Sequence, residues 1–196
     1  MIFINEVLKL VSPIPPSVNH YLGVRGYISN GKVITTMYET TEAKIYKSEF
    51  KRHILDEVKK QNWNWQVNKT QHFYVDCVFY FDRIDKDSSN YDKCLLDAIT
   101  ETKKIWEDDN VALVRTQAVY YDSERPRIEI EIRPVDYIGI FNNNECYTNF
   151  IDRCSTCSRY LSGRCSILKK AIEGRVQSDI TKQNEAFVCN TYKQKK

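Results

Sequence analysis

The run from His72 to Phe81 constrains the fold of this chain more than any other stretch. It is rich in aromatic and β-branched residues and almost continuously apolar, a composition typical of a central strand with at least one covered face. A loop rich in aspartate follows, and an amphipathic helix begins at about Asn90. The sequence therefore predicts a sheet whose central strand delivers several carboxylates to the start of a helix.

Segments on both sides of this strand predict the rest of a sheet and a second helix. Apolar side chains recur every four residues between Thr40 and Lys60, which is typical of a helix with one face in the core. Residues 22–32 contain three glycines and predict a hairpin or a mobile loop. The expected fold class is therefore α+β, a mixed β-sheet with two main helices packed against it. The other predicted strands cover residues 2–11, 33–38, 111–121 and 127–133.

The basic side chains of the long helix allow two interpretations. They form either an ordinary solvated face or a surface that contacts phosphates. The formal net charge of the chain is only +3, so a polyanionic partner has to be argued from such local groups. These basic residues are Lys44, Lys47, Lys51 and Arg52.

Length and composition indicate a soluble protein with one main domain. At 196 residues the chain can hold one sizeable core and a small appendage. No apolar run is long enough to span a membrane, and the N-terminus lacks the features of a signal peptide, so we expect a cytoplasmic protein. The expected parts are a main domain at residues 1–135, a linker at 136–152 and a cysteine-rich subdomain at 153–196.

Two groups of acids flank the helix that begins near residue 90. Asp87 precedes it, Asp108 and Asp109 follow it, and Lys93 and Asp97 lie one turn apart on it. Each aspartate taken alone is more simply an ordinary surface or capping residue. Together, carboxylates from separate elements can converge on one point, which is what a hard divalent cation such as Mg²⁺ requires.

Three short motifs, in this order, resemble those of a known family. They are PPSVN at residues 15–19, DSSNYDKCLLDAI at 87–99 and WEDDNV at 106–111. The pattern is similar to that of the RusA-like Holliday junction endodeoxyribonucleases, and the resemblance covers most of residues 11–134. The expected fold is therefore a RusA-like sheet with its helices, and residues 1–135 are expected to be a nuclease domain.

The resemblance implies an activity and a role for individual residues. It implies a Mg²⁺-dependent nuclease that cleaves Holliday junctions or other branched DNA in recombination and repair, acting as a homodimer. Asp87 and Asp109 would bind the Mg²⁺ ion, Asp108 would assist them, and Lys93 would be the catalytic or phosphate-orienting lysine. Proteins of this kind are often encoded by phages or prophages, so the expected setting is a bacterial or phage-infected cell.

One position departs from the family pattern. Ser89 stands where the family has a second acid. The chain therefore has one carboxylate fewer for the cation, or another acid such as Asp85 or Asp92 takes its place. Two alternative functions follow: a branched-DNA-binding protein with impaired cleavage, or a module that recruits a partner through the cysteine-rich tail.

Cysteines are concentrated after residue 145. A Cys-x2-Cys pair with two further cysteines favours a tetrahedral zinc site, with an iron–sulfur cluster as the second choice. Disulfides or scattered free thiols are the plain alternative, and Cys146 is a possible substitute ligand. A tail of this size has little core of its own, so a structural metal is physically reasonable. The four proposed ligands are Cys154, Cys157, Cys165 and Cys189.

Overall fold

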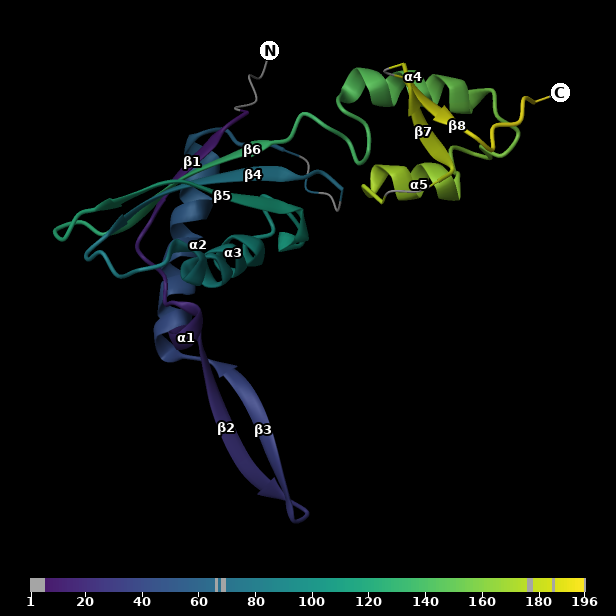
Figure 1. The fold of residues 1–196 in the computed structure, drawn as a ribbon. Coiled ribbons are helices and arrows are strands. Elements are labelled where there is room, and N and C mark those ends of the chain that lie inside the picture. Colours follow the sequence, from purple (N-terminus) through teal and green to yellow (C-terminus); the bar gives the residue numbers. More distant parts are fainter. Residues whose placement is uncertain (1–5, 66, 68–69, 176–177, 185, 196) are drawn as a thin grey trace. The chain divides into compact units, whose positions relative to one another are not determined.

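The chain forms two compact units, Met1–Pro134 and Val135–Lys196 (Figure 1). The computed structural model describes residues 6–65, 67, 70–175, 178–184 and 186–195, so residues 2–5 of the first predicted strand lie outside the described residues. None of the helices in these described ranges is long and apolar enough to cross a membrane. Each unit has its own hydrophobic core.

The first unit is built on a mixed sheet with the strand order β1-β6-β4-β5. Strand β4 (Phe73–Phe81) pairs in parallel with β5 (Ala112–Tyr121) and antiparallel with β6 (Arg127–Pro134), which pairs antiparallel with β1 (Leu8–Ser12). Alternate side chains of β4 are fully buried, beginning with Phe73. The predicted α+β class, with a central strand at this position, is confirmed.

Both main helices of this unit lie on the same side of the sheet (Figure 1). Helix α2 spans Thr41–Lys60 and begins where the Thr40 side chain accepts a hydrogen bond from the Ala43 N–H. Helix α3 spans Asp92–Glu101 and packs against α2. The opposite sheet face carries tyrosines and arginines, with the Arg115 guanidinium 3.8 Å from the centre of the Tyr74 ring.

Trp106 anchors the segment between α3 and β5. Its side chain is fully buried against Phe73, and its Nε1–H donates to Thr100 Oγ1 at 2.7 Å. We expect Trp106→Ala to lower the free energy of unfolding of this unit by about 3–5 kcal/mol, because it opens a large cavity. Urea unfolding followed by the fluorescence of Trp63 and Trp65 measures the change.

A control variant separates the effect of the cavity from the loss of an aromatic ring alone. Tyr121→Ala removes a ring that is 54% exposed, so we expect it to change the free energy of unfolding by less than about 0.5 kcal/mol. If both variants unfolded at the wild-type urea concentration, Trp106 would not be the anchor of this segment.

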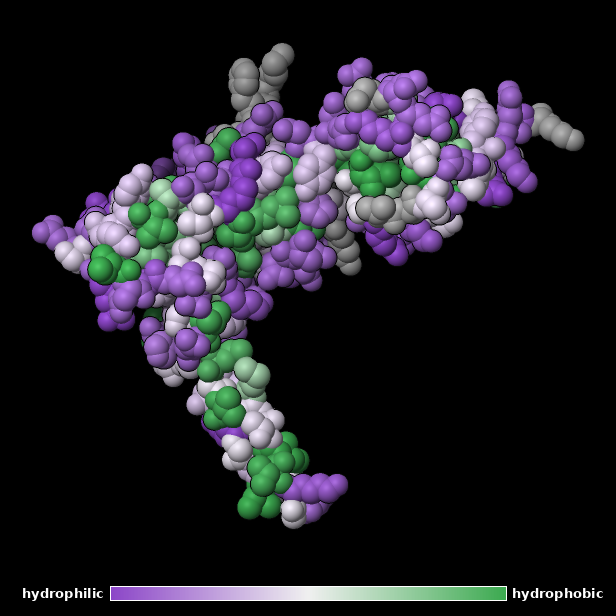
Figure 2. Space-filling model, in the orientation of Figure 1, coloured by the Kyte–Doolittle hydropathy of each residue, from purple (hydrophilic) through white to green (hydrophobic). Residues whose placement is uncertain are grey.

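A two-stranded hairpin projects from the first unit. The short helix α1 (Val18–Tyr21) leads into β2 (Leu22–Ser29), which pairs with β3 (Lys32–Glu39). Asn30 and Gly31 both have positive φ, as a tight two-residue hairpin turn requires. Of the two predictions for residues 22–32, the hairpin is confirmed. Figure 2 shows apolar side chains on its surface, which include Val24, Ile28, Val33 and Met37.

The second unit is smaller and its elements differ from the prediction. It contains α4 (Asn144–Ser155), α5 (Ser166–Ile172) and a hairpin of β7 (Ile180–Gln183) and β8 (Ala186–Cys189). The predicted linker at 136–152 is wrong because α4 begins inside it. Its asparagine run caps that helix, with Asn143 Oδ1 accepting from the Cys146 N–H at 2.9 Å.

Candidate functional site

The acid-rich loop after β4 folds back over β5. The Ser88 and Thr116 hydroxyls lie 3.3 Å apart, which ties the loop to the middle of that strand. A 3₁₀ helix, η1 (Ser88–Tyr91), then leads into α3. Asp87 caps η1, because its Oδ1 accepts from both the backbone N–H and the hydroxyl of Ser89 at 3.0 Å. The first predicted metal ligand therefore has a defined position at the start of this helical segment.

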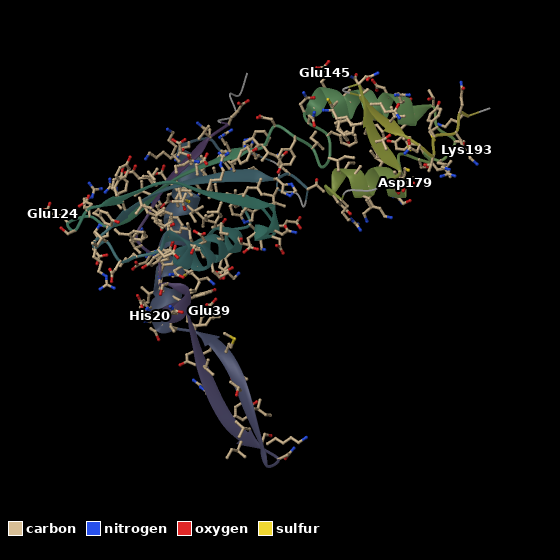
Figure 3. The ribbon with its side chains drawn as sticks, viewed as in Figure 1. His20, Glu39, Glu124, Glu145, Asp179 and Lys193 are labelled. Atoms are coloured by element: carbon tan, nitrogen blue, oxygen red, sulfur yellow. The ribbon has the colours of Figure 1, made fainter. Side chains whose placement is uncertain are left out.

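Asp87 lines a surface groove of about 380 Å³. One wall comes from the proline-rich segment at residues 14–20, which includes His20, and the other from residues 83–91. Figure 3 shows His20 and Glu39 near the base of the β2–β3 hairpin. The fold thus brings two of the three sequence motifs together around one open groove.

Lys93 links the helix to the third motif. Its Nζ lies 2.6 Å from Asp97 Oδ1 and 3.5 Å from Asp109 Oδ2. The hydrogen bond to Asp97 is the main cause of a raised pKa for Lys93, and the charge of Asp109 adds to it. Lys93 therefore keeps its positive charge, and it lies beside Asp109.

The predicted assisting acid, Asp108, has a structural partner. Its Oδ1 accepts from the Asn110 N–H at 3.1 Å and so caps the 3₁₀ helix η2 (Asp109–Val111) that leads into β5. Val111 and the preceding Trp106 are buried, which fixes both ends of this short segment. The apolar residues of the third motif thus position its acids.

A network of charged and hydroxyl groups behind Lys93 was not predicted. The Tyr21 hydroxyl lies 2.5 Å from Asp97 Oδ2 and 3.1 Å from Glu39 Oε1. Burial and the Asp97 carboxylate raise the pKa of Tyr21, so this hydroxyl stays protonated. Glu39 in turn pairs with Lys47 at 2.7 Å. Asp97 therefore has a second anchor besides Lys93.

Lys47 is the clearest residue that sequence reasoning misplaced. The sequence places it among basic residues of the long helix that are either solvated or in contact with phosphates, but only 5% of it is exposed. It pairs with Glu101 as well as Glu39. The signal was its spacing, four residues after Ala43 and three before Phe50, both of which are buried.

The first unit matches a known protein family. The pattern that defines the endodeoxyribonuclease RusA family matches residues 13–133, more than half of the chain. The chain belongs to the RusA endodeoxyribonuclease family. No curated relative matches it. RusA-family nucleases generally depend on a divalent metal ion, and the family match ends before the second unit.

One acid of the RusA unit, Asp92, has a carboxylate oxygen without a hydrogen-bond partner among the described residues. This oxygen, Oδ1, is buried. Burial raises the pKa of Asp92 to about 6, and the charge of Asp87 contributes. A bound cation would relieve both effects. No three Asp, Glu, His or Cys side chains in the described ranges form a metal centre by themselves, but Mg²⁺ usually takes only one or two carboxylates.

Four of the five cysteines of the second unit line one small cavity. It has a volume of about 20 Å³ and receives Cys154 from α4, Cys157 from the following turn, Cys165 from the start of α5 and Cys189 from β8. All seven cysteines of the chain are free thiols. Among the described residues, these four cysteines do not form a group of three or more side chains that could hold a metal ion. The predicted metal site is therefore not confirmed.

Cys157 has a distinctive environment within this cavity. Burial tends to raise its pKa, but hydrogen bonds from the backbone N–H groups of Lys193, Arg159 and Tyr160 more than offset this effect and lower it. The pKa of Cys154 is raised to about 11, first by burial and then by the nearby cysteines. The Cys157 sulfur thus carries negative charge more readily than a free thiol, and three other thiols line the same cavity.

Proposed function

We propose that the first unit is a Mg²⁺-dependent endonuclease that cleaves phosphodiester bonds in Holliday junctions and other branched DNA. The observation that supports this most strongly is the contact of Lys93 with Asp109, which joins two family motifs at one point. Membership of the RusA family supports the nuclease activity itself. The junction preference and the choice of Mg²⁺ are inferences from that membership.

Each side chain has a distinct task in this proposal. Asp87 and Asp109 hold the Mg²⁺ ion, and Asp108 assists from the adjacent position. When bound, the ion neutralises the phosphate and activates the attacking water. Hydrolysis then breaks one P–O bond to a sugar as the bond to water forms. Lys93 stabilises the negative charge that develops on the phosphate oxygens and the leaving oxygen.

The network behind Lys93 restrains this lysine. Asp97 holds the ammonium group at 2.6 Å, and Tyr21 holds Asp97 from the other side. A lysine is a flexible point charge, so such contacts are needed to keep it in a productive position. Asp97 and Tyr21 are therefore positioning residues in this proposal.

The partners in this proposal are branched DNA and a second copy of the chain. A four-way junction has two-fold symmetry and needs two nicks, which suits a homodimer. A cleavage-impaired junction-binding protein is the main alternative, because Ser89 replaces an acid. A partner-recruiting module that uses the cysteine tail is the other alternative.

A nicking assay on a synthetic four-way junction distinguishes these functions. We expect paired, symmetric nicks with Mg²⁺ and none without it, and little cleavage of a linear duplex of the same sequence. A mobility shift without nicks would instead indicate the binding protein. If the protein neither cut nor bound the junction, the recruiting module would remain as the better account of the chain.

We also propose that Cys154, Cys157, Cys165 and Cys189 bind one structural metal ion. Zinc is the first choice because four thiolates suit its tetrahedral coordination, and an iron–sulfur cluster is the second. The shared cavity and the N–H groups directed at the Cys157 sulfur support this proposal. The hydrophobic core around it contains few fully buried residues, so a metal would add needed stability.

A further inference from the structure

We propose that a second groove, beside helix α2, binds backbone phosphates of one arm of the DNA substrate. This inference rests on the proposed action on branched DNA, and it gives a role to the basic face of α2. The groove, called the α2 groove below, has a volume of about 360 Å³. Its charged lining residues are Lys44, Lys47, Lys51 and Arg52 from α2, Glu39 at the end of β3 and Glu101 at the end of α3.

The α2 groove and the groove at Asp87 differ in the sign of their charge. Four basic and two acidic side chains line the α2 groove, so its formal net charge is +2. Three acids and two basic side chains line the groove at Asp87, which gives −1 when His20 is counted as neutral. DNA affinity comes largely from lysine and arginine contacts to phosphates. The groove at Asp87 therefore repels DNA unless a cation is bound there, and attraction has to come from another surface.

The acids of the α2 groove are neutralised within the fold. The buried Lys47 contacts Glu39 at 2.7 Å and also pairs with Glu101. Lys51 contacts the other oxygen of Glu101 at 2.9 Å. These two acids therefore offset the charges of Lys47 and Lys51, and the positive charge of the groove comes from its other basic side chains.

Two basic side chains of α2 are open to an external anion. Lys44 and Arg52 are exposed, and among the described residues neither forms an ion pair with an acid. They lie eight residues apart on one helix face, about 12 Å along its axis, so they can contact different phosphates of one strand. Ser48 lies between them and is also exposed, and its hydroxyl is a further group of the kind that contacts DNA phosphates.

The two grooves lie next to each other at the base of the β2–β3 hairpin. Figure 3 labels His20, which lines the groove at Asp87, and Glu39, which lines the α2 groove. The two segments touch there, because the Thr40 hydroxyl donates to the His20 carbonyl at 2.9 Å. The Tyr21 hydroxyl also lies 3.1 Å from Glu39 Oε1. One DNA arm can therefore lie in the α2 groove while the adjoining part of the same strand reaches the acids.

Binding of a fluorescent four-way junction to the full-length protein, followed by anisotropy at several salt concentrations, tests this assignment. Mg²⁺ is omitted so that the junction is not nicked. We expect the double variant Lys44→Gln with Arg52→Gln to bind at least about tenfold more weakly at low salt. The slope of log affinity against log salt concentration should fall in magnitude by about 2, because each lost phosphate contact releases about one counterion fewer.

A second double variant, Lys59→Gln with Arg125→Gln, is the matched control. It removes the same two charges at exposed positions outside both grooves, so we expect wild-type affinity and salt slope. Equal losses in the two double variants would reveal a general effect of net charge and would overturn the assignment, as would unchanged binding in the groove variant. Glutamine is a good helix former, and circular dichroism confirms that each variant is folded.

Failure of this inference is distinguishable from failure of the proposed function. A wild type that nicks the junction with Mg²⁺, together with a groove variant that binds as the wild type does, would remove only the role of the α2 groove. A wild type that binds the junction but never nicks it would remove the nuclease, while weaker binding by the groove variant would still support the groove. A wild type that neither binds nor nicks would overturn both.

Discussion

Asp87→Asn is expected to reduce nicking of a four-way junction by at least about a thousandfold while leaving junction binding intact or tighter. The substitution removes a charge that holds the metal ion, and it also removes a charge that repels the DNA phosphates. Asparagine caps helices about as well as aspartate, so η1 should persist. Nicking rates and mobility shifts, measured on the same junction and at the same salt concentration, give the two quantities.

A matched variant controls for the change in net charge. Glu124→Gln removes one negative charge on the exposed turn between β5 and β6, where Figure 3 labels it, and should nick at the wild-type rate. The assignment of Asp87 is wrong if its variant nicks as fast as the wild type. Loss of binding as well as nicking would show instead that the substitution disrupts the fold.

Removal of the metal ion that we propose for the second unit should unfold that unit and leave the first unit folded. Structural zinc in small domains contributes about 10–16 kcal/mol of apparent binding free energy, which is folding free energy for a unit with so small a core. Hydrogen exchange after treatment with a strong chelator measures this directly. We expect residues 150–190 to lose their protection, while β4 in the other unit keeps it.

Two cysteine variants define the ligands of this site. Cys157→Ser should release the metal and lower protection in the second unit, because it removes the sulfur that three N–H groups contact. Cys146→Ser should retain one metal ion per chain, since Cys146 does not line the cavity. Metal analysis also separates zinc from iron. Unchanged protection after complete metal removal would contradict a structural role.

The sequence predicted those parts of the fold that depend on local pattern. The strand at Phe73–Phe81 has an apolar side chain at every second position, and the helix from Thr41 has both a capping threonine and a regular apolar stripe. These features depend on short-range spacing, which a single sequence displays directly.

The features that sequence reasoning missed depend on contacts between distant segments. Lys47 is buried because Glu39 and Glu101 reach it from other elements, and no local pattern shows that pairing. The apolar spacing after Ser166 predicts a helix to about Lys182. Helix α5 ends instead at Ile172, and Gly174 follows it with a φ of +74°.

A crystal structure of the full-length protein with Mn²⁺ tests the central claim most directly. The anomalous signal locates the ion without reference to any assumed ligand. We predict one site in the first unit, with Asp87 and Asp109 both bound to the ion and the Lys93 ammonium beside it. An ion bound elsewhere, or carboxylates of Asp87 and Asp109 too far apart to share one ion, would contradict the account.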